Sequence, residues 1–196
     1  MTETALCAGN THESVWKRRI EDYRRHIQDL QSQSYEGASE RNQREAVFRK
    51  AFDLLTPVAR RVLDDINIYF LKGTGEFGVQ PPRADGEGGL IGSWSLTWPL
   101  LRQAVNRFNG NPLEPLRLTA IFPLKPTGAM QWTHPHLALR RPEVIDGLAL
   151  AFPLQVTSPE DADRQEPILR VLAEGELHQR TFEADLNWRI LPFMAE

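Results

Sequence analysis

The histidine pair in the segment 132–136 is the feature of this sequence whose residue types could do chemistry. His134 and His136 stand two positions apart, and in an extended segment such residues point to the same side. Two imidazoles so placed can chelate one metal ion. Two histidines with a carboxylate suit iron, manganese or zinc with an open position for substrate. The candidate ligands of a divalent transition metal are therefore His134 and His136 together with His178 and Glu143.

The spacing around this pair resembles the first motif of the cupins, in which a glycine precedes a His-x-His pair and a glutamate follows it. Gly128, His134 and His136 match that spacing. Glu143 lies several residues too far along, and the second cupin motif is not present around His178. The resemblance implies a metal-dependent enzyme with a barrel fold. In the alternative interpretation, the two rings lie in a polar turn or bind backbone carbonyls.

Other arrangements of catalytic residues are incomplete. There is no Gly-x-Ser-x-Gly elbow, and the single cysteine, Cys7, has no plausible base near it. Residues 73–78 match the letters of the glycine-rich dinucleotide fingerprint. That fingerprint must lead into a helix, and Pro81 and Pro82 prevent one here.

A row of large apolar residues predicts an amphipathic helix over about residues 13–30. The successive spacings are four, three, four and three, which is the a/d pattern of a heptad, and the members are Trp16, Ile20, Tyr23, Ile27 and Leu30. Because a free coiled coil needs three or four heptads, this row must pack against another helix in the same chain or in a partner. We expect Trp16 to act as an interface anchor.

The rest of the chain is expected to divide at a segment rich in glycine and proline. Residues 1–12 are predicted to be a disordered tail, 13–72 a helical arm, 73–89 a linker or loop, and 90–196 an α+β domain. Within the arm we expect a helix over 39–55, a second helix beginning at Thr56-Pro57, and a strand over 66–71.

The second domain is expected to alternate strands with short helices. Strands are predicted over 90–98, 116–124, 131–139 and 147–156, the last of them central because it is apolar on both faces. Helices are expected over 99–108, from Ser158-Pro159, and over 168–177. The predicted fold class is α+β, with two or three N-terminal helices followed by a small, mostly antiparallel sheet carrying one or two packed helices.

Composition limits the classes of partner. The net charge of −3 over 196 residues argues against nucleic-acid binding, which needs a basic surface. The sequence contains no run of 18 apolar residues, so no membrane span is predicted. The first residues lack the basic region of a secretory signal. With one cysteine as well, the expected location is the cytoplasm.

The favoured function is a non-catalytic accessory or scaffold subunit, without a cofactor, that assembles through its N-terminal helices with itself or with a larger complex. The first alternative is the cupin-like metal enzyme described above. The second is a small-molecule binding module lined by tryptophans; the chain has five, Trp16, Trp94, Trp98, Trp132 and Trp188.

Overall fold

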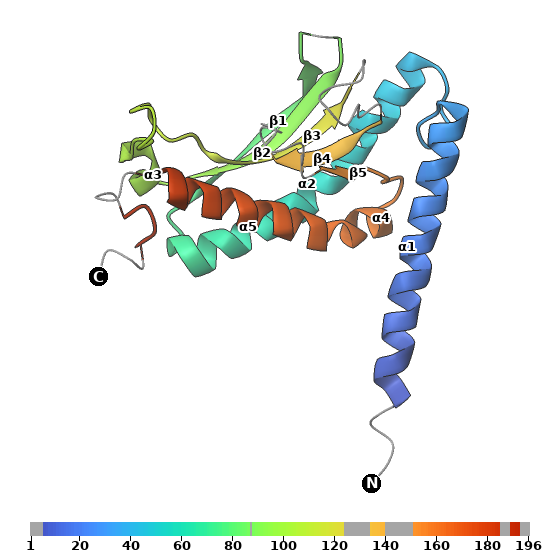
Figure 1. The fold of residues 1–196 in the computed structure, drawn as a ribbon, viewed down its shortest axis with the longest axis horizontal. Helices are drawn as coiled ribbons and strands as arrows, with labels where there is room; N and C mark the ends of the chain where they lie inside the picture. Colours follow the sequence, from blue (N-terminus) through green and yellow to red (C-terminus); the bar gives the residue numbers. More distant parts are fainter. Residues whose placement is uncertain (1–5, 87, 124–133, 140–150, 185–188, 193–196) are drawn as a thin grey trace. The chain divides into compact units, whose positions relative to one another are not determined.

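The computed structural model describes residues 6–86, 88–123, 134–139, 151–184 and 189–192. These residues form five helices and a five-stranded antiparallel sheet, so the expected α+β fold with an N-terminal helical region is confirmed (Figure 1). The chain separates into two compact units, residues 1–47 and 48–196. The division falls within a helix.

The N-terminal region contains two long helices, α1 (Leu6–Ser32) and α2 (Arg41–Leu71). The predicted helix over 13–30 is therefore present, but it begins earlier and takes up part of the predicted tail. The prediction of a strand over 66–71 was wrong, because this segment is the last part of α2. The helix buries Val62, Leu63 and Ile66 at helical spacing, and this packing overrides the strand preference of β-branched residues.

The predicted break at Pro57 was also wrong, since α2 passes through this residue. Proline has no N–H for the carbonyl four residues earlier, which belongs to Asp53. Pro57 and Asp53 are both exposed, so water can reach that carbonyl. The Thr56 hydroxyl donates to the Phe52 carbonyl at 2.9 Å. The helix therefore continues through Pro57 although the hydrogen bond to Asp53 is missing.

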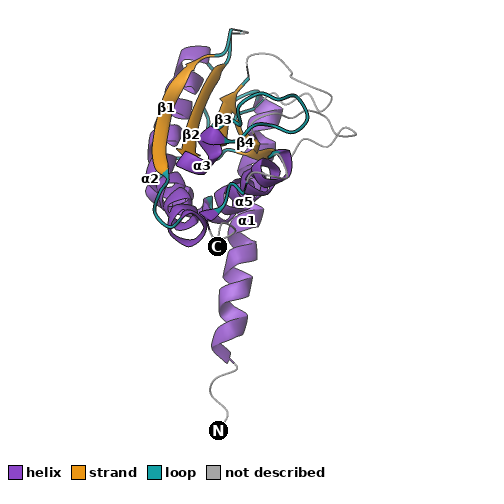
Figure 2. Ribbon diagram, turned by 90° about the vertical axis from the view of Figure 1, so that its left-hand side faces the viewer, coloured by secondary structure: helices purple, strands orange, loops and turns teal. Residues whose placement is uncertain are grey.

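The sheet is a simple meander whose five strands are neighbours in sequence order (Figure 2). The strands are β1 (Glu76–Ala84), β2 (Leu90–Thr97), β3 (Leu116–Phe122), β4 (His136–Leu139) and β5 (Ala151–Pro153). Among the described strands the order is open, whereas the cupin resemblance implies a closed barrel. The short β5 pairs with β4 at an edge of this order, so its predicted central position was wrong.

β1 lies within the segment predicted to be a linker, and that prediction of a loop was wrong for residues 76–84. The strand tolerates Pro81 and Pro82 for two reasons. It lies at the edge of the sheet, where one side of the backbone needs no partner. The prolines also coincide with a shift of register between Gln80 and Arg83, where ladder hydrogen bonds are interrupted.

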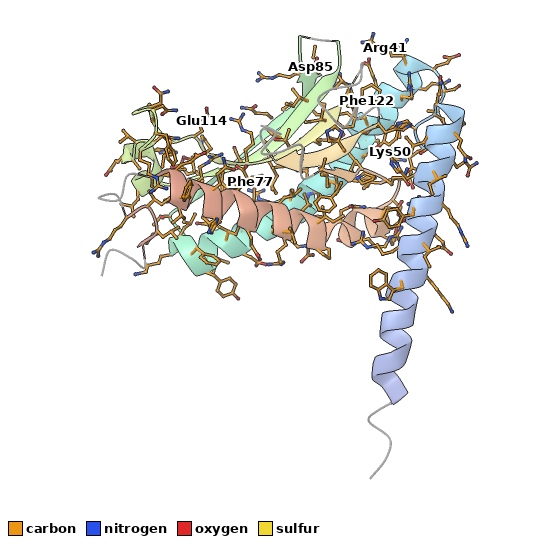
Figure 3. The ribbon with its side chains drawn as sticks, viewed as in Figure 1. Arg41, Lys50, Phe77, Asp85, Glu114 and Phe122 are labelled. Atoms are coloured by element: carbon orange, nitrogen blue, oxygen red, sulfur yellow. The ribbon has the colours of Figure 1, made fainter. Side chains whose placement is uncertain are left out.

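The core lies between α2 and one face of β2 and β3. The register pairs Trp94 of β2 with Leu118 of β3, so these two side chains lie on the same face of the sheet. The Trp94 ring stacks on Phe52 with centroids 4.3 Å apart. Phe122, at the end of β3, packs against Phe48 with centroids 5.7 Å apart (Figure 3). Gly92 leaves room for Phe52, since a Cβ here would lie 2.6 Å from its ring.

Three further helices complete the second unit: α3 (Pro99–Gln103), α4 (Pro159–Arg164) and α5 (Glu166–Glu183). The predicted helix start at Ser158 is confirmed, because its hydroxyl accepts from the Asp161 N–H at 3.1 Å. Asp161 in turn accepts from the backbone and the hydroxyl of Thr157. Helix α5 packs along β3 and β4, and Arg170 joins it to Asp65 of α2 at 2.8 Å.

Candidate protein-interaction interface

The five residues of the predicted heptad row lie along α1 and are all exposed; we call them the seam. Their exposed fractions are 67% for Trp16, 48% for Ile20, 62% for Tyr23, 51% for Ile27 and 44% for Leu30. Residues three and four apart lie on one side of a helix, so the seam is a continuous apolar stripe. Single exposed apolar residues are ordinary, but a continuous patch of large ones marks an interaction surface.

The seam ends where α1 ends. Gln33 follows the helix with a φ of 52°, and the Ser34 N–H donates to the Asp29 carbonyl at 3.0 Å. The buried Asp29 carboxylate accepts from the Ser34 hydroxyl and from the Glu36 N–H, each at 2.9 Å. These bonds fix the turn after the helix. The stripe therefore has a defined C-terminal limit just beyond Leu30.

The ion pairs described below for Arg25 of α1 lie away from the seam. Arg25 donates to Asp22 at 3.0 Å and lies 3.7 Å from a carboxylate oxygen of Glu36. One consequence is that these pairs stabilise the outer side of α1 and leave the apolar stripe available.

The histidine pair does not form a metal centre with the described residues. His136 begins β4, is buried, and lies between Ile121 of β3 and Pro153 of β5. Its Nδ1 is 3.0 Å from the His134 carbonyl. Because a carbonyl only accepts, the His136 ring donates there.

Of the other two predicted ligands, only His178 lies among the described residues. His178 is an exposed residue of α5, and Glu143 lies outside the described residues. Within the described part of the chain, no three histidine, cysteine or acidic side chains come together in a way that could hold a metal ion.

His136 is expected to make the stability of the fold depend on pH. Burial lowers its pKa from the ordinary value of 6.5, and the His134 carbonyl opposes that effect. The unfolded chain therefore binds a proton more readily than the folded chain, so the free energy of unfolding is highest above about pH 6.5 and falls as the pH drops below it. Denaturant titrations between pH 7 and pH 5 measure this loss.

The matched variants for that measurement are His136→Gln and His178→Gln. His136→Gln is expected to flatten the pH dependence, whereas His178→Gln, on the exposed side of α5, should leave it in place. An unchanged slope in His136→Gln would show that other groups cause the acid sensitivity.

The tryptophans do not support a ligand pocket in the described part of the chain. Trp94 and Trp98 are fully buried. Their indole N–H groups donate to the Thr56 hydroxyl at 2.9 Å and to the Ile190 carbonyl at 2.6 Å. Both residues are thus core, while Trp16 is the exposed one. Trp132 and Trp188 lie outside the described residues.

The glycines of the dinucleotide-like segment have a structural role. Gly75 donates its N–H to the Asn67 side chain at 2.7 Å and accepts from it at 3.2 Å. A Cβ at this position would lie 2.7 Å from the Asn67 oxygen. The segment is the turn that leads from α2 into β1.

One exposed aromatic cluster was not foreseen from the sequence. The Arg107 guanidinium lies 4.7 Å from the Phe108 ring centroid and 4.1 Å from that of Phe182. Both rings are more than half exposed. Since Phe182 ends α5 and Phe108 follows α3, only the tertiary structure brings them together, and no spacing in the sequence signals it.

Comparison of the chain with protein-family models, with curated proteins and with solved structures gives no match. In the described part of the chain, no helix is apolar over a length that would cross a bilayer. The seam is therefore the feature on which a functional proposal rests.

Proposed function

We propose that this protein is a non-catalytic accessory or scaffold subunit that assembles with other protein through the seam of α1. The observation that carries the proposal is the exposure of five consecutive a/d residues, each of them 44% or more exposed. Complete burial of one large apolar side chain gains about 1.5–3 kcal/mol. Covering half-exposed side chains along the seam would therefore gain several kcal/mol before the cost of association.

The second unit supports this role as a stable body that carries the helix. Its core is closed around Phe52, Trp94 and Trp98, so the unit does not need α1 to bury its aromatic residues. A subunit of this kind needs a stably folded part and a surface that binds its partner, and the seam is that surface.

A paired substitution tests the proposal. Ile20→Asp together with Ile27→Asp puts two carboxylates in the middle of the seam, and we expect it to abolish assembly, since a charge cannot be buried there without a partner. The measurement is the particle mass of the tagged chain in gentle extracts of its native cells, by size-exclusion chromatography with light scattering.

The matched control is Ile68→Asp together with Val171→Asp, which changes two apolar residues of similar exposure outside α1. This variant should assemble as the wild-type chain does, and circular dichroism should show unchanged helix content in both variants. If the wild-type chain and the seam variant have the same particle mass, α1 is not an assembly element and the proposal is wrong.

A further inference from the structure

The basic residues beside the seam define what kind of helix can cover it. With Ile20 and Ile27 at heptad position a, positions e and g are taken by Lys17, Arg19, Arg24 and His26. Side chains at e and g flank the apolar contact and meet the partner's flanking residues. Lys17, Arg19 and Arg24 are cationic and His26 becomes cationic when it is protonated, so none of the four adds a negative charge. The flanks of the seam are therefore of one sign.

The acidic residues of α1 occupy other positions. Glu21 is at b and Asp22 and Asp29 are at c, on the side away from the seam, whereas Glu13 is at a, one heptad before Ile20. Asp22 is engaged by Arg25, and the Asp29 carboxylate accepts from the turn that follows the helix. Asp22 and Asp29 are thus engaged within the protein's own structure, whereas the basic flanks lie beside the apolar contact.

We propose that the seam docks on an amphipathic helix of another protein whose flanking positions are acidic. This inference rests on the proposed function and names the partner's chemistry. Carboxylates at the flanks would meet the four basic positions across the interface, and such complementarity selects the partner and speeds the encounter. The partner's apolar stripe needs to be only about two and a half heptads long, to match the seam.

A second copy of α1 fits this surface poorly. In a parallel pair, position g of one helix meets position e of the next heptad in the other, which places Arg19 opposite Arg24. In an antiparallel pair, e meets e and g meets g, so the basic residues again face one another. Like charges at such positions destabilise the pair. The charge pattern of the flanks thus selects against self-association.

The width of the seam favours a helix over a lipid surface. A helix that lies in a membrane interface buries a broad apolar face. From Trp16 to Leu30 the apolar residues occupy only positions a and d, which is the narrow stripe of a helix-to-helix contact. A membrane is the competing partner that the experiment must distinguish.

The test measures binding of two synthetic peptides to the full-length chain by fluorescence anisotropy. Both peptides span residues 6–33. One has the native sequence, and the other carries Lys17→Glu, Arg19→Glu, Arg24→Glu and His26→Glu. The seam residues are identical, so the peptides differ only at their flanks. The acidic peptide is expected to bind about tenfold more tightly at low salt, because ion pairs at the flanks replace contacts between like charges. This advantage should shrink at high salt.

The outcomes separate the two proposals. If the native peptide binds as tightly as the acidic one, the seam pairs with a second copy and this inference is wrong, while the proposed function stands. If neither peptide binds, the seam is not a helix-docking surface and both proposals are wrong. If vesicles containing phosphatidylserine bind the full chain through the seam more tightly than the acidic peptide does, the partner is a membrane and this inference is wrong.

A charge reversal in the chain itself provides the second arm. The variant Arg19→Glu with Arg24→Glu should lose its preference for the acidic peptide. The matched control reverses Lys50 and Arg83, two exposed bases outside α1 (Lys50 is labelled in Figure 3), and should keep the preference. A preference for the acidic peptide that is equal in both variants would show that the flanks of the seam do not select the partner.

Discussion

Replacing Trp94 with alanine is expected to lower the free energy of unfolding by about 3–5 kcal/mol, which is the usual cost of removing a buried large aromatic side chain. Trp94 is fully buried and stacks on Phe52 with an interplanar angle of 7°. Its N–H also donates to the Thr56 hydroxyl at 2.9 Å. The alanine variant leaves a cavity between β2 and α2 and removes that hydrogen bond. Chemical denaturation followed by circular dichroism measures the loss.

Two further variants separate the causes of this loss. Trp94→Phe keeps an aromatic ring on Phe52 but removes the N–H, so it should cost less than the alanine variant. Tyr69→Ala removes an aromatic residue that is 77% exposed on the same helix as Phe52, and its cost should stay within about 0.5 kcal/mol. A Trp94→Ala variant as stable as Tyr69→Ala would show that the stacked pair does not hold β2 on α2.

The second large effect is expected at the buried ion pair of α5. Arg180 and Glu176 are 3% and 1% exposed, and their closest nitrogen and oxygen atoms lie 2.9 Å apart. The Glu176 carboxylate also accepts from the Arg117 N–H at 3.3 Å, and Arg180 pairs with Glu183 at 2.5 Å. Arg180→Met leaves the Glu176 carboxylate buried without its cation. We expect this variant to lose about 3–5 kcal/mol of stability.

The double variant Glu176→Met with Arg180→Met should regain much of that loss, because it removes both buried charges and keeps apolar volume. Glu174→Met changes an exposed acid on the same helix and is the control for helix propensity, with a small expected effect. Thermal and denaturant unfolding of the three variants gives the comparison. If the double variant were less stable than Arg180→Met, the loss in Arg180→Met would not be caused by the unpaired charge of Glu176.

These core variants also bear on the proposed function. Trp94, Glu176 and Arg180 belong to the second unit, residues 48–196, whereas the seam belongs to the first, residues 1–47. Some of these variants will remain folded under the assay conditions. We expect those variants to bind the acidic peptide with the affinity of the wild-type chain. The stability of the second unit and binding through the seam should therefore change independently of one another.

The features that the sequence predicted well are those fixed by local spacing. The seam, the strands that became β2 and β3, and the Ser158 helix start each depend on residues within a few positions of one another. Periodicity and capping are local rules, so one sequence is enough to apply them.

The errors arose where tertiary context overrides local preference. Residues 66–71 have the composition of a strand, yet they continue a helix whose inner side is already buried. The segment around Pro81 and Pro82 has the composition of a loop, yet it forms an edge strand with an irregular register. Whether a strand lies at the edge or in the centre of a sheet depends on the order in which the strands pair. The strand over 147–156, which was expected to be central, forms β5 at an edge.

For the candidate site, the sequence by itself determined the order and spacing of the seam and the basic charges beside it, because both follow from helical geometry. The exposed fractions of the five seam side chains came only from the structure, since helical spacing alone does not give the exposure of a side chain. The tertiary structure likewise determined the roles of Trp94 and His136. Trp94 became core by stacking on a distant helix, and His136 became a buried strand residue bound to a backbone carbonyl.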